Sequence, residues 1–133
     1  MSAIRILVAD DNDDILGFLM FVLSDAGYDV RTVRTGSEIV PALRRHRPSV
    51  VLMDMQLGDM DGLDATRAIK SDPTTSHTAV IVYSAHAQQS DHDAARTAGC
   101  DAYLVKPSPI DHIIGTIESL HHRRDARQRR ADA

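Results

Sequence analysis

Five short strand-like runs alternate with five helical patterns along this sequence, and few folds accommodate that order. The runs cover residues 3–9, 28–33, 50–54, 79–83 and 102–105. The run at 50–54, Val-Val-Leu-Met-Asp, is apolar over consecutive positions and rich in β-branched valine, which is typical of a strand buried on both faces of a parallel sheet. Strands that alternate with helices predict such a sheet, with helices on both faces and right-handed crossovers.

For five strands of this kind we expect a doubly wound, flavodoxin-like α/β fold with the strand order 2-1-3-4-5. The predicted helices cover residues 13–26, a segment after 35, 63–70, 87–98 and a segment after 108. Thr35 and Glu38 match a capping box for the second helix, but Pro41 lacks the donor that a helix interior needs. The second helix therefore either begins late or is kinked. The first helix shows an apolar stripe of Ile15, Phe18, Leu19, Val22 and Leu23.

The bulk properties predict one domain and an uneven charge. The chain has 133 residues, 43% hydrophobic, which suits a single core. Its net charge is −4, but residues 121–133 hold five Arg and two Asp, a charge of +3, so residues 1–120 carry −7. An acidic body argues against direct nucleic-acid binding. We expect a domain over residues 1–121 and a basic, disordered tail over 122–133.

The single cysteine, Cys100, excludes an internal disulfide framework and fits a reducing compartment. No apolar run approaches the length that spans a membrane, and no signal peptide precedes the first strand. These features predict a cytoplasmic protein.

Polar side chains follow four of the predicted strands. They are Asp10 and Asp11 after the first strand, Asp54 at the end of the third, Ser84 after the fourth and Lys106 after the fifth. In the order 2-1-3-4-5 these strand ends are neighbours at one edge of the sheet, where α/β folds place their ligands. Crowded carboxylates need a counter-charge, and their oxygens suit Mg²⁺ completed by phosphate oxygens. The cluster thus predicts phosphoryl transfer, with Asp54 as nucleophile because it lies on the central strand.

Taken together, these motifs make the sequence resemble the receiver domain of two-component response regulators over residues 4 to about 120. The matching motifs are Asp10-Asp11, Asp54 with Met60-Asp61-Gly62, Ser84-Ala85, Tyr103 and Lys106-Pro107. The resemblance implies that Asp54 accepts the phosphoryl group and that Asp11, Asp54 and the Gln56 carbonyl bind Mg²⁺, with Asp10 nearby. It also implies that Lys106 contacts the phosphoryl group, that Ser84 and Tyr103 are the switch residues, and that the Lys106–Pro107 bond is cis.

By this resemblance the protein is a phosphoacceptor switch rather than an enzyme. Its phosphoryl donor is a sensor histidine kinase or a histidine phosphotransfer protein. It signals to a downstream protein through the face formed by the fourth helix, the fifth strand and the last helix, and a homodimer is an open alternative. We expect a stand-alone receiver. A receiver fragment of a larger hybrid kinase or regulator remains a second interpretation.

A third interpretation is an aspartate phosphatase of the haloacid-dehalogenase kind, which also combines Mg²⁺, Ser or Thr, and Lys. That class has a second Asp two residues after its nucleophile, and Gln56 stands there. The sequence also departs from the receiver pattern at Gly58, where the family commonly has proline, and we expect a more mobile loop there. His86 lies where the family varies the residues that tune dephosphorylation, and a solvated rim histidine is the alternative. We expect His77, His92, His121 and His122 to be solvated.

Overall fold

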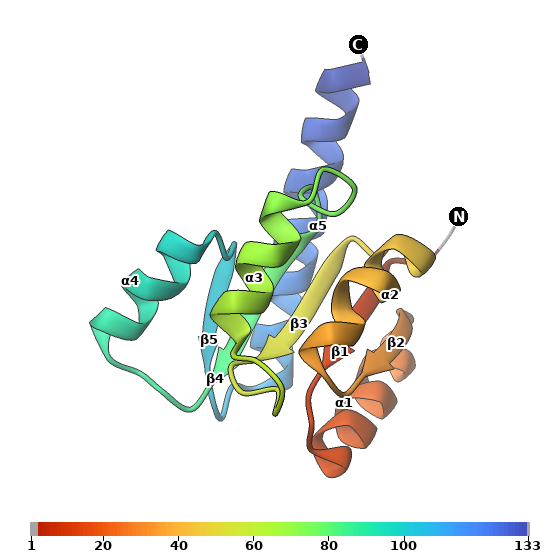
Figure 1. The fold of residues 1–133 in the computed structure, drawn as a ribbon. Coiled ribbons are helices and arrows are strands. Elements are labelled where there is room, and N and C mark those ends of the chain that lie inside the picture. The colour runs from red at the N-terminus through yellow and green to blue at the C-terminus, as the bar shows by residue number, and fades with distance from the viewer. Residues whose placement is uncertain (1–2, 133) are drawn as a thin grey trace.

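The computed structural model describes residues 3–132, which form a five-stranded parallel sheet between two helical layers (Figure 1). The elements are β1 (Arg5–Ala9), α1 (Asp13–Asp25), β2 (Asp29–Val33), the 3₁₀ helix η1 (Gly36–Glu38), α2 (Ile39–His46), β3 (Val50–Asp54), α3 (Gly62–Ser71), β4 (Ala79–Ser84), α4 (Gln89–Ala98), β5 (Ala102–Val105) and α5 (Ile110–Asp132). The strand order is β2-β1-β3-β4-β5 and every pairing is parallel. The predicted fold class is therefore confirmed.

The two faces of the sheet carry separate cores because successive side chains of a strand point to opposite faces. Val50 and Leu52 of β3 pack with residues of α1 and α5, whereas Val51 and Met53 pack with residues of α2 and α3. All four side chains are essentially inaccessible to solvent. Burial on both faces accounts for the unbroken apolar run in the sequence of β3.

The second helix begins late, and proline is tolerated for that reason. Residues Gly36–Glu38 form η1, and α2 begins only at Ile39. Pro41 thus lies in the first turn of α2, where backbone N–H groups have no intrahelical acceptor to lose. The Thr35 hydroxyl donates to the Glu38 carboxylate at 2.7 Å, but its side chain makes no capping bond to the backbone.

One expectation about the helices needs correction. Phe18 belongs to the predicted apolar stripe of α1, yet it is 60% exposed, and Phe21 is 72% exposed. The sheet covers only one side of α1, so the edge of a broad apolar stripe stays in solvent. The segment 122–132 continues α5 as a regular helix that extends beyond the sheet (Figure 1), and the expectation that this tail is disordered stays a prediction. Over the described residues no helix is long and apolar enough to cross a membrane.

Two glycines give a matched test of helix energetics. Gly17 lies inside α1, and no atom lies within 4 Å of the position that a Cβ would occupy. Because alanine favours a helix more than glycine does, Gly17→Ala is expected to raise the free energy of unfolding by about 0.5–1 kcal/mol. Gly99 caps α4 with a φ of +105°, so Gly99→Ala is expected to lower the free energy of unfolding by about 1–2 kcal/mol. Urea unfolding of both variants measures this, and equal shifts of the same sign would contradict it.

Candidate functional site

Three carboxylates gather at the carboxyl edge of the sheet, between β1 and β3. Oxygen atoms of Asp10, Asp11 and Asp54 all lie within 4.8 Å of one another. Asp54 is the last residue of β3, and β1 ends at Ala9, directly before the acidic pair. Asp10 is 3% exposed, whereas Asp11 is exposed and Asp54 is half-buried. The order β2-β1-β3 reverses the direction of winding at this point, which is where a doubly wound sheet leaves a crevice.

Lys106 supplies the counter-charge from the other side of the crevice. Its Nζ donates to Asp54 Oδ1 at 2.9 Å and lies 3.8 Å from Asp10 Oδ2. The chain leaves β5 one residue earlier, and the Lys106 N–H donates to the Ser84 carbonyl at 2.7 Å, which fixes the start of this side chain. The Lys106–Pro107 peptide bond is cis, as the resemblance implied. Nζ also lies 5.0 Å from the ring centre of Tyr83, an additional cation–π contact.

The surroundings of Asp10 disfavour the ionised form of its carboxyl group. Burial raises the pKa of the Asp10 carboxyl, and the charges of Asp54 and Asp11 raise it further. The N–H of Asn12 donates to Asp10 Oδ1 at 2.9 Å, and this bond together with Lys106 acts in the opposite direction. Asn12 also accepts from the backbone of α1 as its N-cap, so the helix start and the acidic cluster are built together. A cation placed among these oxygens would relieve the repulsion.

The side chains of Ser84 and Tyr103 both form hydrogen bonds with the backbone of His86. Ser84 is 1% exposed, and its Oγ accepts from the His86 N–H at 3.1 Å. The Tyr103 hydroxyl donates to the His86 carbonyl at 2.8 Å. The ring of His92, on α4, lies 4.5 Å from the ring of Tyr103. The two expected switch residues are thus linked through one peptide segment, and His92 is not simply solvated.

A tight loop follows β3 and lies beside the acidic cluster. Gln56 is exposed and forms an isolated antiparallel bridge with Asp61. Gly58 has a φ of +82°, which proline cannot adopt, and this explains the departure from the family pattern. A Cβ on Gly62 would lie 3.0 Å from the Asp54 carbonyl oxygen, a tight contact that favours glycine beneath the loop. The loop is closed by backbone bonds, such as Leu57 N–H to Met60 O at 3.1 Å.

Sequence reasoning missed some residues that shape the site. The Asp59 carboxylate accepts the N–H groups of Gly36 and Ser37 at 2.7 and 3.0 Å, which ties the loop to η1 and lowers the pKa of Asp59. Tyr83 packs under Lys106. Neither residue carries a motif, because both act through contacts between segments far apart in the chain.

A parallel sheet of this order, with acidic side chains after β1 and β3 and a lysine after β5, defines the class of response regulator receivers. The family model for the response regulator receiver domain matches residues 6–118. The chain therefore belongs to the response regulator receiver domain family, which favours this interpretation over the dehalogenase-type phosphatase.

Relatives and solved structures agree with that assignment. Polar-differentiation response regulators called DivK, from Brucella anthropi and Brucella ovis, are 33% and 32% identical over 114 residues, 86% of this chain and 93% of theirs. One similar structure is the receiver domain of a Pseudomonas aeruginosa sensor histidine kinase, which was solved with magnesium in its active-site cleft. It superposes with a TM-score of 0.83 at 28% sequence identity and covers 91% of this chain and 99% of its own. A CheY-like receiver from Methanospirillum hungatei shares the fold, with a TM-score of 0.87 at 24% identity over 95% and 99% of the two chains.

The raised pKa of Asp10 predicts a pH-dependent stability effect. The folded state holds the Asp10 proton more tightly than the unfolded state does, so ionisation of this group costs stability as the pH rises above the ordinary value of 3.8. Asp10→Asn removes that charge and keeps an oxygen for the Asn12 N–H. Without Mg²⁺ it is expected to raise the free energy of unfolding at pH 7 by on the order of 1 kcal/mol.

This gain should disappear below pH 3.8, because both states are then protonated at this position. Urea unfolding at neutral and at acidic pH measures it. Asp93→Asn, at an exposed position of α4, is the control and is expected to change the free energy of unfolding by less than about 0.5 kcal/mol. A destabilised Asp10→Asn protein at pH 7 would contradict the electrostatic account.

Proposed function

We propose that this receiver accepts a phosphoryl group on Asp54 from the phosphohistidine of a sensor histidine kinase or of a histidine phosphotransfer protein. The observation that carries the proposal is the ion pair of 2.9 Å between Lys106 Nζ and Asp54 Oδ1 at the mouth of the crevice. The Asp54 side chain is 16% exposed, so it is held in place by its partner and is still open to solvent on one side. Asp54 accepts a hydrogen bond from this lysine and ends β3, the middle strand of the sheet, whereas Asp10 lies 3.8 Å from the lysine after β1.

The transfer exchanges one bond for another. A carboxylate oxygen of Asp54 attacks phosphorus, the bond from phosphorus to the imidazole nitrogen breaks, and its electron pair leaves with the histidine. The product is an acyl phosphate. Lys106 stays beside the reacting oxygens and offsets their growing negative charge, which a preorganised cation does without further rearrangement. Water that attacks the same phosphorus later returns the free carboxylate.

The acidic cluster fits Mg²⁺. Its three carboxylates lie close enough to share one ion, and the charges of Asp54 and Asp11 add to the effect of burial in raising the pKa of Asp10. We assign Asp11, Asp54 and the backbone carbonyl of Gln56 as the residues that would hold the ion, with Asp10 beside them. Mg²⁺ at this position supplies the second positive charge for a phosphoryl group, in an oxygen-only site of the type it prefers.

Phosphorylation should depend on Asp54 and on the metal. Incubation with acetyl phosphate and Mg²⁺ is expected to add the mass of one phosphoryl group, measured on the intact protein. Asp54→Asn should lose nearly all of the adduct because an amide oxygen is a poor nucleophile, and Asp11→Ala should reduce it at least about tenfold because a metal ligand is lost. Asp64→Asn on α3, outside the cluster, is the control and should retain full labelling. Full labelling of the Asp54 variant would refute the assignment.

We propose further that the signal leaves through the face formed by α4, β5 and α5. Ser84 and Tyr103 are the moving parts, and the His86 backbone that both of them bind couples them. Helix α4 is easily displaced because it buries only Ala95 and Ala98; Ala94 is exposed, and Ala87 precedes the helix. A helix that buries little apolar area can change its packing at a small cost in free energy. A downstream protein or a second copy of the chain is the partner that such a face would bind.

Backbone amide shifts measured with and without beryllofluoride, a phosphoryl mimic, test the output face. We expect shifts at Ser84 and His86 and across residues 87–120, because the Tyr103 hydroxyl must exchange its acceptor when Ser84 moves. The same titration on Asp54→Asn is the control and should leave these amides unchanged. Changes confined to the loops around Asp54 would refute the proposed route.

A further inference from the structure

Two cavities lie at the amino-terminal edge of the sheet, at the end opposite the acidic cluster. One has a volume of about 270 Å³ and lies between α5, the loop after α3 and the start of β4. The other has a volume of about 720 Å³ and lies between the start of β1, the end of α2 and the same loop. His77 and Arg124 line both, so the cavities adjoin and form one depression.

The lining of this depression is strongly basic. The cationic side chains are Lys70, Arg123, Arg124 and Arg127 in the first cavity and Arg5, Arg44, Arg47 and Arg124 in the second. Among the described residues that line either cavity, Asp101 is the single carboxylate, and it pairs with Lys70 at 2.9 Å while accepting the Val80 N–H at 2.7 Å. The net charge of the lining is therefore strongly positive in a chain whose overall charge is −4.

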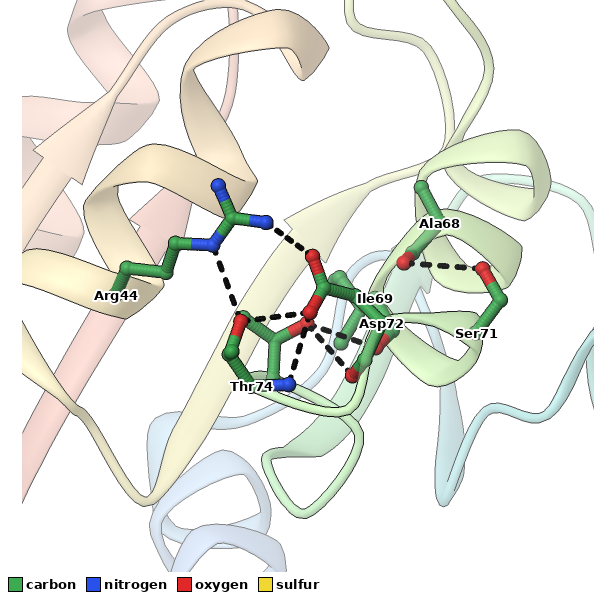
Figure 2. Close-up of polar contacts among 7 residues, drawn as sticks. Arg44, Ala68, Ile69, Ser71, Asp72 and Thr74 are labelled. Carbon is green, nitrogen blue, oxygen red and sulfur yellow. Dashed lines mark hydrogen bonds and ion pairs between the residues drawn. The ribbon is translucent and has the colours of Figure 1, made fainter.

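One of these arginines, Arg44, stabilises the loop after α3. Figure 2 shows Arg44 reaching from α2 toward Asp72 and Thr74, at the beginning of the loop after α3. It forms an ion pair with Asp72 and donates from Nε to the Thr74 hydroxyl at 3.0 Å. Arg44 thereby holds the loop that forms one wall of both cavities.

Three of the other arginines lack such an ion pair. Arg5, Arg47 and Arg124 form no ion pair with any side chain that the structure describes. The Nε atom of Arg124 is buried and has no hydrogen-bond partner among the described residues. Buried donors in folded proteins are nearly always paired with a protein group or an ordered water, so this N–H is available to an acceptor from solvent or from a ligand.

The continuation of α5 creates the site. Arg123, Arg124 and Arg127 lie within about one turn on the part of α5 that extends beyond the sheet. A bond of 2.9 Å between the His121 ring and the Ser49 hydroxyl fixes the helix against the start of β3. Partial burial lowers the pKa of His77, and the nearby charges of Arg124, Lys70 and Arg47 lower it further, which agrees with a positive potential in the depression.

We propose that this depression binds a small anion that carries two phosphate groups. Arginine binds phosphate oxygens through paired N–H donors, and each cavity offers its own set, with Arg124 between them. A concave site formed by five separate segments favours a compact ligand over an extended polyanion, which a flat basic surface suits better. The site lies at the end of the sheet opposite the Asp54 crevice and shares no lining residue with the acidic cluster.

Calorimetric titration of the full chain with pyrophosphate in Mg²⁺-free buffer tests the proposal. We expect measurable binding, at least about tenfold tighter than that of inorganic phosphate because two groups are bound at once. Arg124→Gln should weaken it at least about tenfold, and the Nε–Hε signal of Arg124 should shift on binding to the unmodified protein. Arg47→Gly is the second variant, since Arg47 has a φ of +50° that glycine adopts without strain, so its fold is preserved.

Arg96→Gln is the matched control, because Arg96 is 77% exposed on α4 and lies outside both cavities. It should bind pyrophosphate as the unmodified protein does. Equal affinity of the Arg47, Arg124 and Arg96 variants would overturn the proposal. Absence of pyrophosphate binding would overturn it as well, and binding of a DNA duplex or of phosphatidylglycerol vesicles alone would assign the surface to an extended polyanion instead.

Discussion

The ion pair between Lys106 and Asp54 is the contact on which this structure's functional edge depends. Three carboxylates within 4.8 Å would repel one another without a cation, and Lys106 places its Nζ 2.9 Å from one of them and 3.8 Å from another. Residues more than 50 positions apart can meet in this way because parallel strands deliver all their carboxyl ends to one edge. Two buried cores hold those strands in place, and the strands in turn fix the positions of the side chains at the site.

The two ends of the sheet have opposite electrostatic character. Acidic side chains cluster at the carboxyl edge, whereas arginines from β1, α2 and α5 gather around the cavities at the other. β3 connects the two ends: Ser49, directly before it, binds His121 of α5, and Asp54 is its last residue. A ligand at the basic end and a phosphoryl group at the acidic end would thus act on the same central strand and the same C-terminal helix.

The helices differ in how much apolar surface they bury. α1 and α5 cover one face of the sheet with large apolar residues such as Leu23 and Ile117, and neither is accessible to solvent. α4 contributes only two buried alanines. Because weakly packed elements open at the lowest free-energy cost, this difference in packing supports the proposed output face beside Tyr103, whose hydroxyl binds the His86 carbonyl.

The sequence alone determined the fold class and the acidic cluster. Periodicity identified the strands, and the polar residues that end them had to converge once the strand order was known. Tertiary structure decided what local patterns cannot encode. Pro41 was compatible with two helix geometries, and only packing selected the late start. Phe18 fitted an apolar stripe, and only the position of the sheet showed that it is exposed. The arginines of the last segment indicated a solvated tail, because charged side chains favour water. The basic depression exists only because α5 brings some of these arginines beside Arg5 and Arg47. Such a contact between distant segments leaves no local signal in the sequence.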